Sequence, residues 1–135
     1  MNILVIDAQG GGLGKQLVTA IRDRIKGAHI TAVGTNTMAT SAMLKAGADQ
    51  AATGENAVIV GCRKADIIVG PIGIVIADSM LGEITGTMAV AVGQSSAKRI
   101  LIPMNHCDNV VAGAKKQTLG DFIEDAVKEI ENICG

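Results

Sequence analysis

The residues best suited to bind a ligand are four glycines near the start of the chain, Gly10, Gly11, Gly12 and Gly14. They follow an apolar run that ends at Asp7, and they precede a segment whose apolar residues recur every four positions. A strand, a glycine turn and a helix in this order can bind phosphate, because the first N–H groups of a helix lack partners and its dipole attracts an anion. We expect ligand contacts from Asp7, Gln9, Gly10, Gly11, Gly12, Leu13, Gly14 and Lys15.

Other loops should meet this turn at one edge of a sheet. In doubly wound sheets, ligands bind beyond the carboxyl ends of the strands, where the strand order reverses. Further predicted strands end at Gly34, at Gly70 and at Pro103, so the residues that follow them belong to the same rim. The sequence therefore predicts additional ligand contacts from Thr35, Asn36, Gly70, Pro71 and Asn105.

The glycine turn is similar to two dinucleotide-binding loops, each in part. The G-x-x-x-G-x-G turn of short-chain dehydrogenases fits Gly12 and Gly14, with Ala8 in place of its first glycine. The open fingerprint G-x-G-x-x-G fits Gly10 and Gly12, with Lys15 in place of its third glycine. These resemblances imply a dinucleotide-type ligand.

Three further loops resemble the turn less well. The phosphate loop G-x-x-x-x-G-K-[ST] fits Gly14 and Lys15, but Gln16 replaces the hydroxyl that binds magnesium. The variant loop of partitioning-type ATPases, K-G-G-x-G-K-[ST], lacks the same hydroxyl. The D-x-H-x-x-G turn of cobalamin-binding domains fits Asp7, but Gln9 replaces the cobalt-ligating histidine. An ATPase with a degenerate phosphate loop is therefore a weaker alternative, and cobalamin binding a remote one.

The end of the second predicted strand bears on the choice of cofactor. Sites selective for NAD usually carry an acidic residue there, about 20 residues past the turn, which bonds the ribose hydroxyls. The candidates in this chain are Thr35, Asn36 and Thr37, which include no acid for NAD and no arginine for a 2′-phosphate. The sequence disfavours NAD and leaves NADP, a mononucleotide or another phosphorylated ligand open.

Candidate catalytic residues are few. The chain has no tyrosine and so cannot use the proton transfer of short-chain dehydrogenases. The best polar cluster contains His106, a possible acid or base, and Cys107, a possible nucleophile, with Asp78 and Glu83 as the nearest carboxylates. Adjacent side chains usually point in different directions, so a catalytic role for the pair is the less favoured interpretation. Three widely spaced cysteines offer no metal site.

The hydrophobic pattern alternates between strands and helices along the whole chain. Short apolar runs predict strands at residues 3–7, 29–34, 48–53, 66–70 and 99–103, and a possible sixth at 109–113. Helical spacing predicts helices at 13–27, 37–46, 56–64, from Met80 or Leu81 to Ser96, and from Thr118 onward, where Asp121 completes a capping box. We therefore predict an α/β fold of three layers, a doubly wound and mostly parallel sheet of five or six strands, in one Rossmann-like domain spanning residues 1–135.

Bulk properties exclude several classes of partner. A net charge of −1 and a single aromatic residue, Phe122, disfavour nucleic acid, and no apolar run approaches the roughly 20 residues of a membrane helix. Free cysteines, and a first strand that begins next to Met1, predict a cytoplasmic protein without a signal peptide. The apolar segment 72–77 has no obvious cover, so we expect a homo-oligomer.

The sequence as a whole resembles a small uncharacterised Rossmann-like family, a domain of unknown function with this strand, this glycine turn and the GPIG arrangement at residues 70–73. The resemblance implies the fold and a nucleotide site, but no activity. We expect a protein that binds a nucleotide or dinucleotide, with an NADP-like ligand favoured. The alternative is a non-catalytic ligand-sensing module whose occupancy changes its contacts with a partner. Whether the protein is an enzyme is left open.

Overall fold

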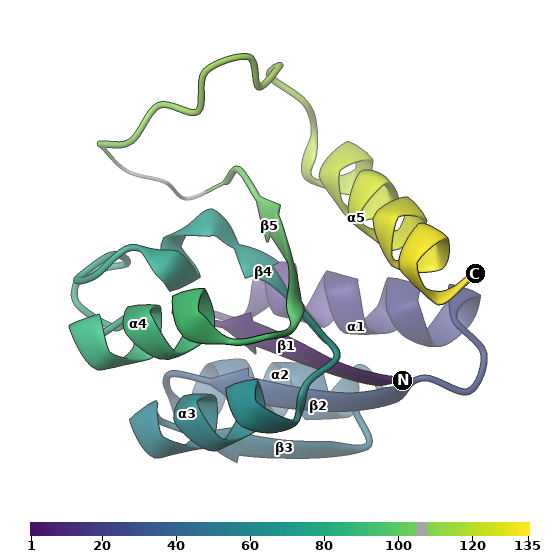
Figure 1. The fold of residues 1–135 in the computed structure, drawn as a ribbon, viewed down its shortest axis with the longest axis horizontal. Helices are drawn as coiled ribbons and strands as arrows, with labels where there is room; N and C mark the ends of the chain where they lie inside the picture. The colour runs from purple at the N-terminus through teal and green to yellow at the C-terminus, as the bar shows by residue number, and fades with distance from the viewer. Residues whose placement is uncertain (105–107) are drawn as a thin grey trace.

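A computed structural model of the chain describes residues 1–104 and 108–135. Strands and helices alternate along it (Figure 1). In chain order they are β1 (Asn2–Asp7), α1 (Gly12–Arg24), β2 (His29–Gly34), α2 (Thr37–Lys45), β3 (Gln50–Thr53), α3 (Glu55–Lys64), β4 (Ile67–Pro71), the 3-10 helix η1 (Ile72–Val75), α4 (Gly86–Gln94), β5 (Lys98–Ile102) and α5 (Leu119–Cys134).

Five strands form one parallel sheet in the described part of the chain, in the order β3-β2-β1-β4-β5. The central strand β1 pairs with β2 along its whole length and with β4 on its other side. The strand order reverses between β1 and β4, as in a doubly wound fold. The predicted α/β fold with a parallel sheet is confirmed, and β3 lies at a sheet edge as expected from its low apolar content.

Helices cover both faces of the sheet and complete three layers (Figure 1). Helices α1, α2 and α5 pack on one face, and α3, η1 and α4 pack on the other. Side chains of β1 alternate between these cores: Ile3 and Val5 enter the first, and Leu4 and Ile6 enter the second. Because both faces are buried, β1 reads as a continuous apolar run.

Helix α5 begins and docks as its sequence predicts. The Thr118 hydroxyl accepts from the Asp121 amide at 3.2 Å, and the Asp121 carboxylate accepts from the Thr118 amide at 3.4 Å, so the capping box is present. Arg24 at the end of α1 pairs with Glu124, at 2.6 Å, and with Glu131 of α5. These contacts fix α5 beside α1.

Two predicted elements differ in the structure. No strand forms at residues 109–113, where Val110 is 91 % exposed and joins neither core, so the sheet has five strands within residues 1–104 and 108–135. The helix expected from Met80 or Leu81 begins only at Gly86, because Met80 and Leu81 have φ angles of 55° and 59° that a right-handed helix excludes. Met80 and Ile84 are nevertheless buried, so their helical spacing reflects loop packing.

The apolar segment 72–77 is covered in part by its own chain. Its first four residues form η1, in which Gly73 and Ile74 are buried and Ile74 joins the second core. The other residues of the segment are partly or fully exposed, so the oligomer expected from it stays a prediction. None of the helices in the described ranges is both long and apolar enough to cross a bilayer.

Candidate functional site

The carboxyl ends of β1, β2 and β4 lie side by side, and the loops that follow them form one rim. The turn after β1 contains the four glycines and leads into α1. The loop after β2 contains Thr35 and Asn36, and the connection from β4 to α4 contains Asp78 and Glu83. The polar residues predicted after three different strands therefore share one edge of the sheet.

Asp7, the last residue of β1, is buried under the turn and only 3 % exposed. Its carboxylate oxygens accept from the amides of Ala8, at 2.8 Å, and of Gly14, at 2.7 Å. Gly11 at the N-cap position of α1 has no side chain to cap the helix, so Asp7 supplies the acceptor. Asp7 thus holds the turn from inside by bonding its amides, and the contact with a ligand expected from Asp7 stays a prediction.

Two of the glycines have packing functions. Gly11 has a φ of 76°, and a Cβ atom there would lie 2.7 Å from the Cα of Ala39 in α2. A Cβ atom at Gly14 would lie 2.6 Å from Sδ of Met43 and 2.8 Å from Cβ of Asp7. Both glycines are needed because α1 approaches its neighbours too closely for a side chain.

The other two glycines, Gly10 and Gly12, have no such function. A Cβ atom at either would meet nothing within 4 Å, and neither has a positive φ. The amides of Gly10, Gly12 and Leu13 donate to no acceptor among the residues that the structure describes, whereas Gly11 donates to the Ala8 carbonyl at 3.0 Å. The turn therefore offers a ligand three unpaired N–H groups beside two positions without side chains.

A carboxylate from a distant segment lies at the other end of the turn. Oε1 of Glu83 accepts from the Gln9 amide at 2.9 Å, from the Thr35 hydroxyl at 2.6 Å and from Nδ2 of Asn36 at 2.8 Å. Asn36 also donates to the Gln9 carbonyl at 2.9 Å and caps α2 by accepting from the Ala39 amide. The ends of β1 and β2 are thus joined through one glutamate.

The loop that carries Glu83 has an unusual backbone. Asp78, Met80 and Leu81 all adopt positive φ angles, of 64°, 55° and 59°. Such conformations cost about 1–2 kcal/mol each for residues with a Cβ atom. The buried Met80 attaches the loop to the second core, whereas Leu81 is 95 % exposed. Glu83 of the same loop accepts from the Gln9 amide of the turn.

The two carboxylates of the site have pKa values that move in opposite directions. Hydrogen bonds, chiefly the one from Thr35, hold the pKa of Glu83 below its usual 4.5. Burial raises the pKa of Asp7 above its usual 3.8, although bonds from Gly14 and Ala8 oppose this shift and the charge of Glu83 adds to it. Hydrogen bonds thus favour the charged form of Glu83, whereas burial disfavours the charged form of Asp7.

The structure separates the remaining predicted residues into three groups. Lys15 and Gln9 are exposed beside the turn, and Asp78 is exposed on the neighbouring loop without a described side-chain partner. Gly70 and Pro71 are buried in β4, and a Cβ atom at Gly70 would lie 2.5 Å from the Ile6 carbonyl, so Gly70 permits the close approach of β4 to β1. The other predicted positions, Asn105, His106 and Cys107, lie outside the described residues.

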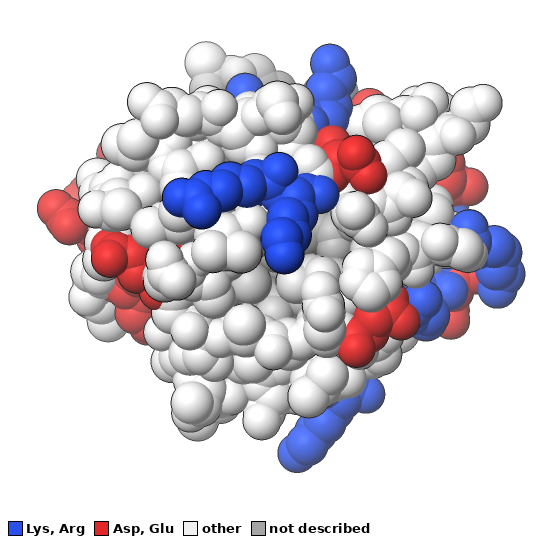
Figure 2. Space-filling view, turned by 60° about the horizontal axis from the view of Figure 1, so that its bottom comes forward, with Lys and Arg blue, Asp and Glu red and all other residues white. Residues whose placement is uncertain are grey.

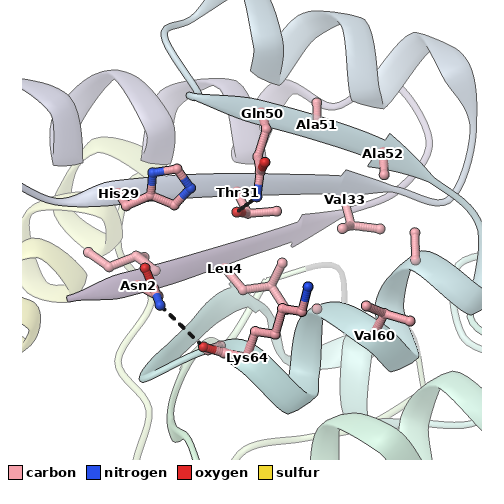
Figure 3. Close-up of a pocket in the computed structure, with 14 residues that line it drawn as sticks. Asn2, Leu4, His29, Thr31, Val33, Gln50, Ala51, Ala52, Val60 and Lys64 are labelled. Carbon is pink, nitrogen blue, oxygen red and sulfur yellow. Dashed lines mark hydrogen bonds between the residues drawn. The ribbon is translucent and has the colours of Figure 1, made fainter.

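Sequence reasoning missed two features of the molecule. It placed Glu83 near residues 105–108 and found no acid at the end of the second strand, whereas the fold brings Glu83 to that strand end. It also missed a hollow of about 360 Å³ away from the turn, where α3 only partly covers β2 and β3. Figure 3 shows Thr31, Val33, Gln50 and Ala52 on the sheet side of this hollow, opposite Val60 and Lys64 of α3.

Comparisons with known proteins identify the family and the fold. The sequence model of one family, described as a domain of unknown function (DUF3842), matches residues 2–135. No curated protein matches the chain. Among solved structures, the chain is similar to a dodecameric FMN-dependent UbiX-like decarboxylase from Escherichia coli O157:H7, with 16 % sequence identity and a TM-score of 0.50 over 100 % of this chain and 95 % of that chain.

Proposed function

Since the chain belongs to DUF3842, a family without an assigned function, we propose from the geometry of its site that it binds a nucleotide-type ligand through a phosphate group. The observation that carries the proposal is the set of unpaired amides at Gly10, Gly12 and Leu13. They lie at the start of a 13-residue helix whose dipole favours an anion. The open space at Gly10 and Gly12 lets a phosphate approach the backbone.

The structural neighbour supports this class of ligand. It is FMN-dependent, and FMN is a phosphorylated nucleotide-type molecule. The exposed Lys15, one turn into α1, can add a positive charge next to the phosphate. This charge and the helix dipole offset the repulsion between Glu83 and a phosphate bound nearby. We propose FMN and pyridine dinucleotides as the first candidates.

Binding alone is the function we propose, in the sense of a ligand-binding or ligand-sensing module. Asp7 is occupied with structural hydrogen bonds, and His106 and Cys107 lie outside the described residues, so we assign no catalytic residue. Magnesium-dependent ATP hydrolysis is the weaker alternative, because Gln16 stands where a magnesium-binding hydroxyl is needed.

A thermal-shift panel with FMN, NAD, NADP and ATP tests the proposal. A ligand present at about 100 times its Kd should stabilise the protein by about 2.7 kcal/mol. The decisive variant is Gly12→Leu, which places a side chain at the open approach to the amides, where a Cβ atom meets nothing within 4 Å. Gly93→Leu in α4 is its matched control, because that glycine is also helical and also has nothing within 4 Å of a Cβ atom.

We expect Gly12→Leu to weaken binding at least about tenfold, since each lost hydrogen bond to a charged group is worth about 1.5–3 kcal/mol. Gly93→Leu should bind like the wild type. If no ligand stabilises the wild type, or if Gly12→Leu leaves every affinity unchanged, the glycine turn is only a strand-to-helix connection.

We also propose that the chain assembles with copies of itself. The hollow beside β2 and β3 exposes part of a sheet face, lined by Ala52, Ala57 and Val60 among others. Figure 2 shows a face on which most of the surface carries no Lys, Arg, Asp or Glu, although basic side chains adjoin one another near its middle. The structural neighbour is dodecameric. A second copy of this chain would cover the open part of the sheet.

A further inference from the structure

We propose that Glu83 binds the ribose hydroxyls of the ligand, so that the site selects a nucleotide with a free 2′-hydroxyl over one with a 2′-phosphate. The inference rests on the proposed function, because it assumes a nucleotide whose phosphate lies on the glycine turn. It adds to that function the identity of the sugar and the residue that recognises it.

The position of Glu83 is the first step. In folds of this type, an acidic residue at the end of the second strand bonds the ribose hydroxyls of a ligand whose phosphates lie at the first turn. This chain has Thr35 and Asn36 at that strand end, and both donate to Oε1 of Glu83, at 2.6 and 2.8 Å. The carboxylate therefore occupies the place of the usual acid, although it comes from the connection between β4 and α4.

The free oxygen of Glu83 is the second step. Oε1 accepts three hydrogen bonds, from Thr35, from Asn36 and from the Gln9 amide, which fix the carboxylate in place. Oε2 accepts none from any residue in the described ranges, and the side chain is partly exposed. A fixed carboxylate with one free oxygen is an acceptor for a vicinal diol, whose two hydroxyls are donors.

The charge of Glu83 gives the selectivity. A free ribose donates hydrogen bonds to the carboxylate, whereas a 2′-phosphate carries only acceptors and a negative charge. Like charges in contact at a binding site cost several kcal/mol. Among the described residues, no lysine or arginine is a partner of Glu83, so none of its described contacts neutralises a second negative group.

A simpler interpretation is that the hydrogen bonds of Glu83 only hold its loop against the turn. The variant Glu83→Gln separates the two interpretations, because the glutamine carbonyl keeps an acceptor for Thr35, Asn36 and the Gln9 amide while the charge is lost. If Glu83 only holds the loop, the substitution will not change the ratio of the affinities for NAD and NADP. If Glu83 binds the ribose hydroxyls, that ratio will change.

The experiment measures Kd for NAD and for NADP by calorimetry with the wild type and with Glu83→Gln. Glu124→Gln is the matched control, since Glu124 is also a carboxylate that accepts a hydrogen bond, from Arg24 at 2.6 Å, but its partner is the last residue of α1, at the end of that helix opposite the turn. We expect the wild type and Glu124→Gln to bind NAD at least about tenfold tighter than NADP. In Glu83→Gln the preference should fall to about threefold or less.

Equal affinity of the wild type for the two dinucleotides, or an unchanged preference in Glu83→Gln, overturns the inference and leaves the phosphate site standing. If FMN binds in a manner that depends on Gly12 and NAD does not bind, the inference is likewise overturned while the phosphate site stands. Absence of binding by FMN, NAD, NADP and ATP overturns both this inference and the proposed function. Unfolding in urea shows separately whether Glu83→Gln retains the native fold.

Discussion

Substituting Gly11 by alanine should destabilise the protein strongly, while the same change at the adjacent Gly12 should not. Gly11 adopts a φ of 76°, and a Cβ atom there would lie 2.7 Å from Cα and 3.2 Å from the carbonyl oxygen of Ala39. Those atoms belong to the backbone of α2 and cannot rotate away. Gly12 is the first residue of α1 and has open space around it.

The size of the effect follows from two costs. A left-handed conformation costs an alanine about 1–2 kcal/mol more than it costs a glycine. Forcing α1 and α2 apart to admit the methyl group adds about 1–3 kcal/mol, as for other overpacked sites. We expect Gly11→Ala to lower the free energy of unfolding by about 2–5 kcal/mol, whereas Gly12→Ala should change it by less than about 1 kcal/mol and in the stabilising direction.

Equilibrium unfolding in urea, followed by far-ultraviolet circular dichroism, measures both variants against the wild type. The comparison is internally controlled, because the two variants have the same composition and differ by one position. If Gly11→Ala and Gly12→Ala shift the unfolding free energy equally, within about 0.5 kcal/mol, the close contact between α1 and α2 does not exist as described. The separation of packing glycines from ligand-accessible glycines would then fail with it.

Three further predictions concern other parts of the molecule. Hydrogen bonds lower the pKa of Glu83, so the charged Glu83 stabilises the fold above its usual pKa of 4.5, and this contribution is lost as the pH falls through the pKa of the folded state. Glu83→Gln should therefore reduce the loss of unfolding free energy that urea unfolding measures below about pH 5. Burial is the chief cause of the raised pKa of Asp7, which acts with the opposite sign, and the charge of Glu83 is the smallest cause, so its loss in Glu83→Gln opposes the flattening only in part; an unchanged acid slope would contradict the role of Glu83. Thr118→Ala should lower the thermal unfolding free energy by about 1 kcal/mol through loss of the α5 cap, whereas Thr19→Ala on the surface of α1 should not; equal effects would deny the capping box. Sedimentation velocity should show association that rises with concentration, and a monomer at all concentrations would refute the proposed assembly.

The sequence alone determined the order and type of most elements. The continuous apolar run of β1 and the four-residue spacing in α1 are properties of neighbouring residues, so they are visible without a structure. The capping box at Thr118 is likewise local, because its two hydrogen bonds join residues three apart. These patterns specify a parallel α/β fold, since only strands buried on both faces and helices with one apolar face satisfy them together.

Local patterns misled where a loop packs as tightly as a helix. Met80 and Ile84 have helical spacing and are buried, but the positive φ angles of Met80 and Leu81 delay α4 to Gly86. The spacing of apolar residues reports which side chains are buried and does not report the backbone that buries them. The positive φ angles of this loop depend on its contacts with the second core, which the sequence pattern does not contain.

Only the tertiary structure decided what each residue of the rim does. It assigned Gly11 and Gly14 to helix packing and Asp7 to the inside of the turn, and it left Gly10 and Gly12 open. It also brought Glu83 to the end of β2, 48 residues from its partner Thr35. A sequence pattern records neighbours along the chain, whereas this carboxylate reaches its site only because parallel strands bring their carboxyl ends to one edge of the sheet.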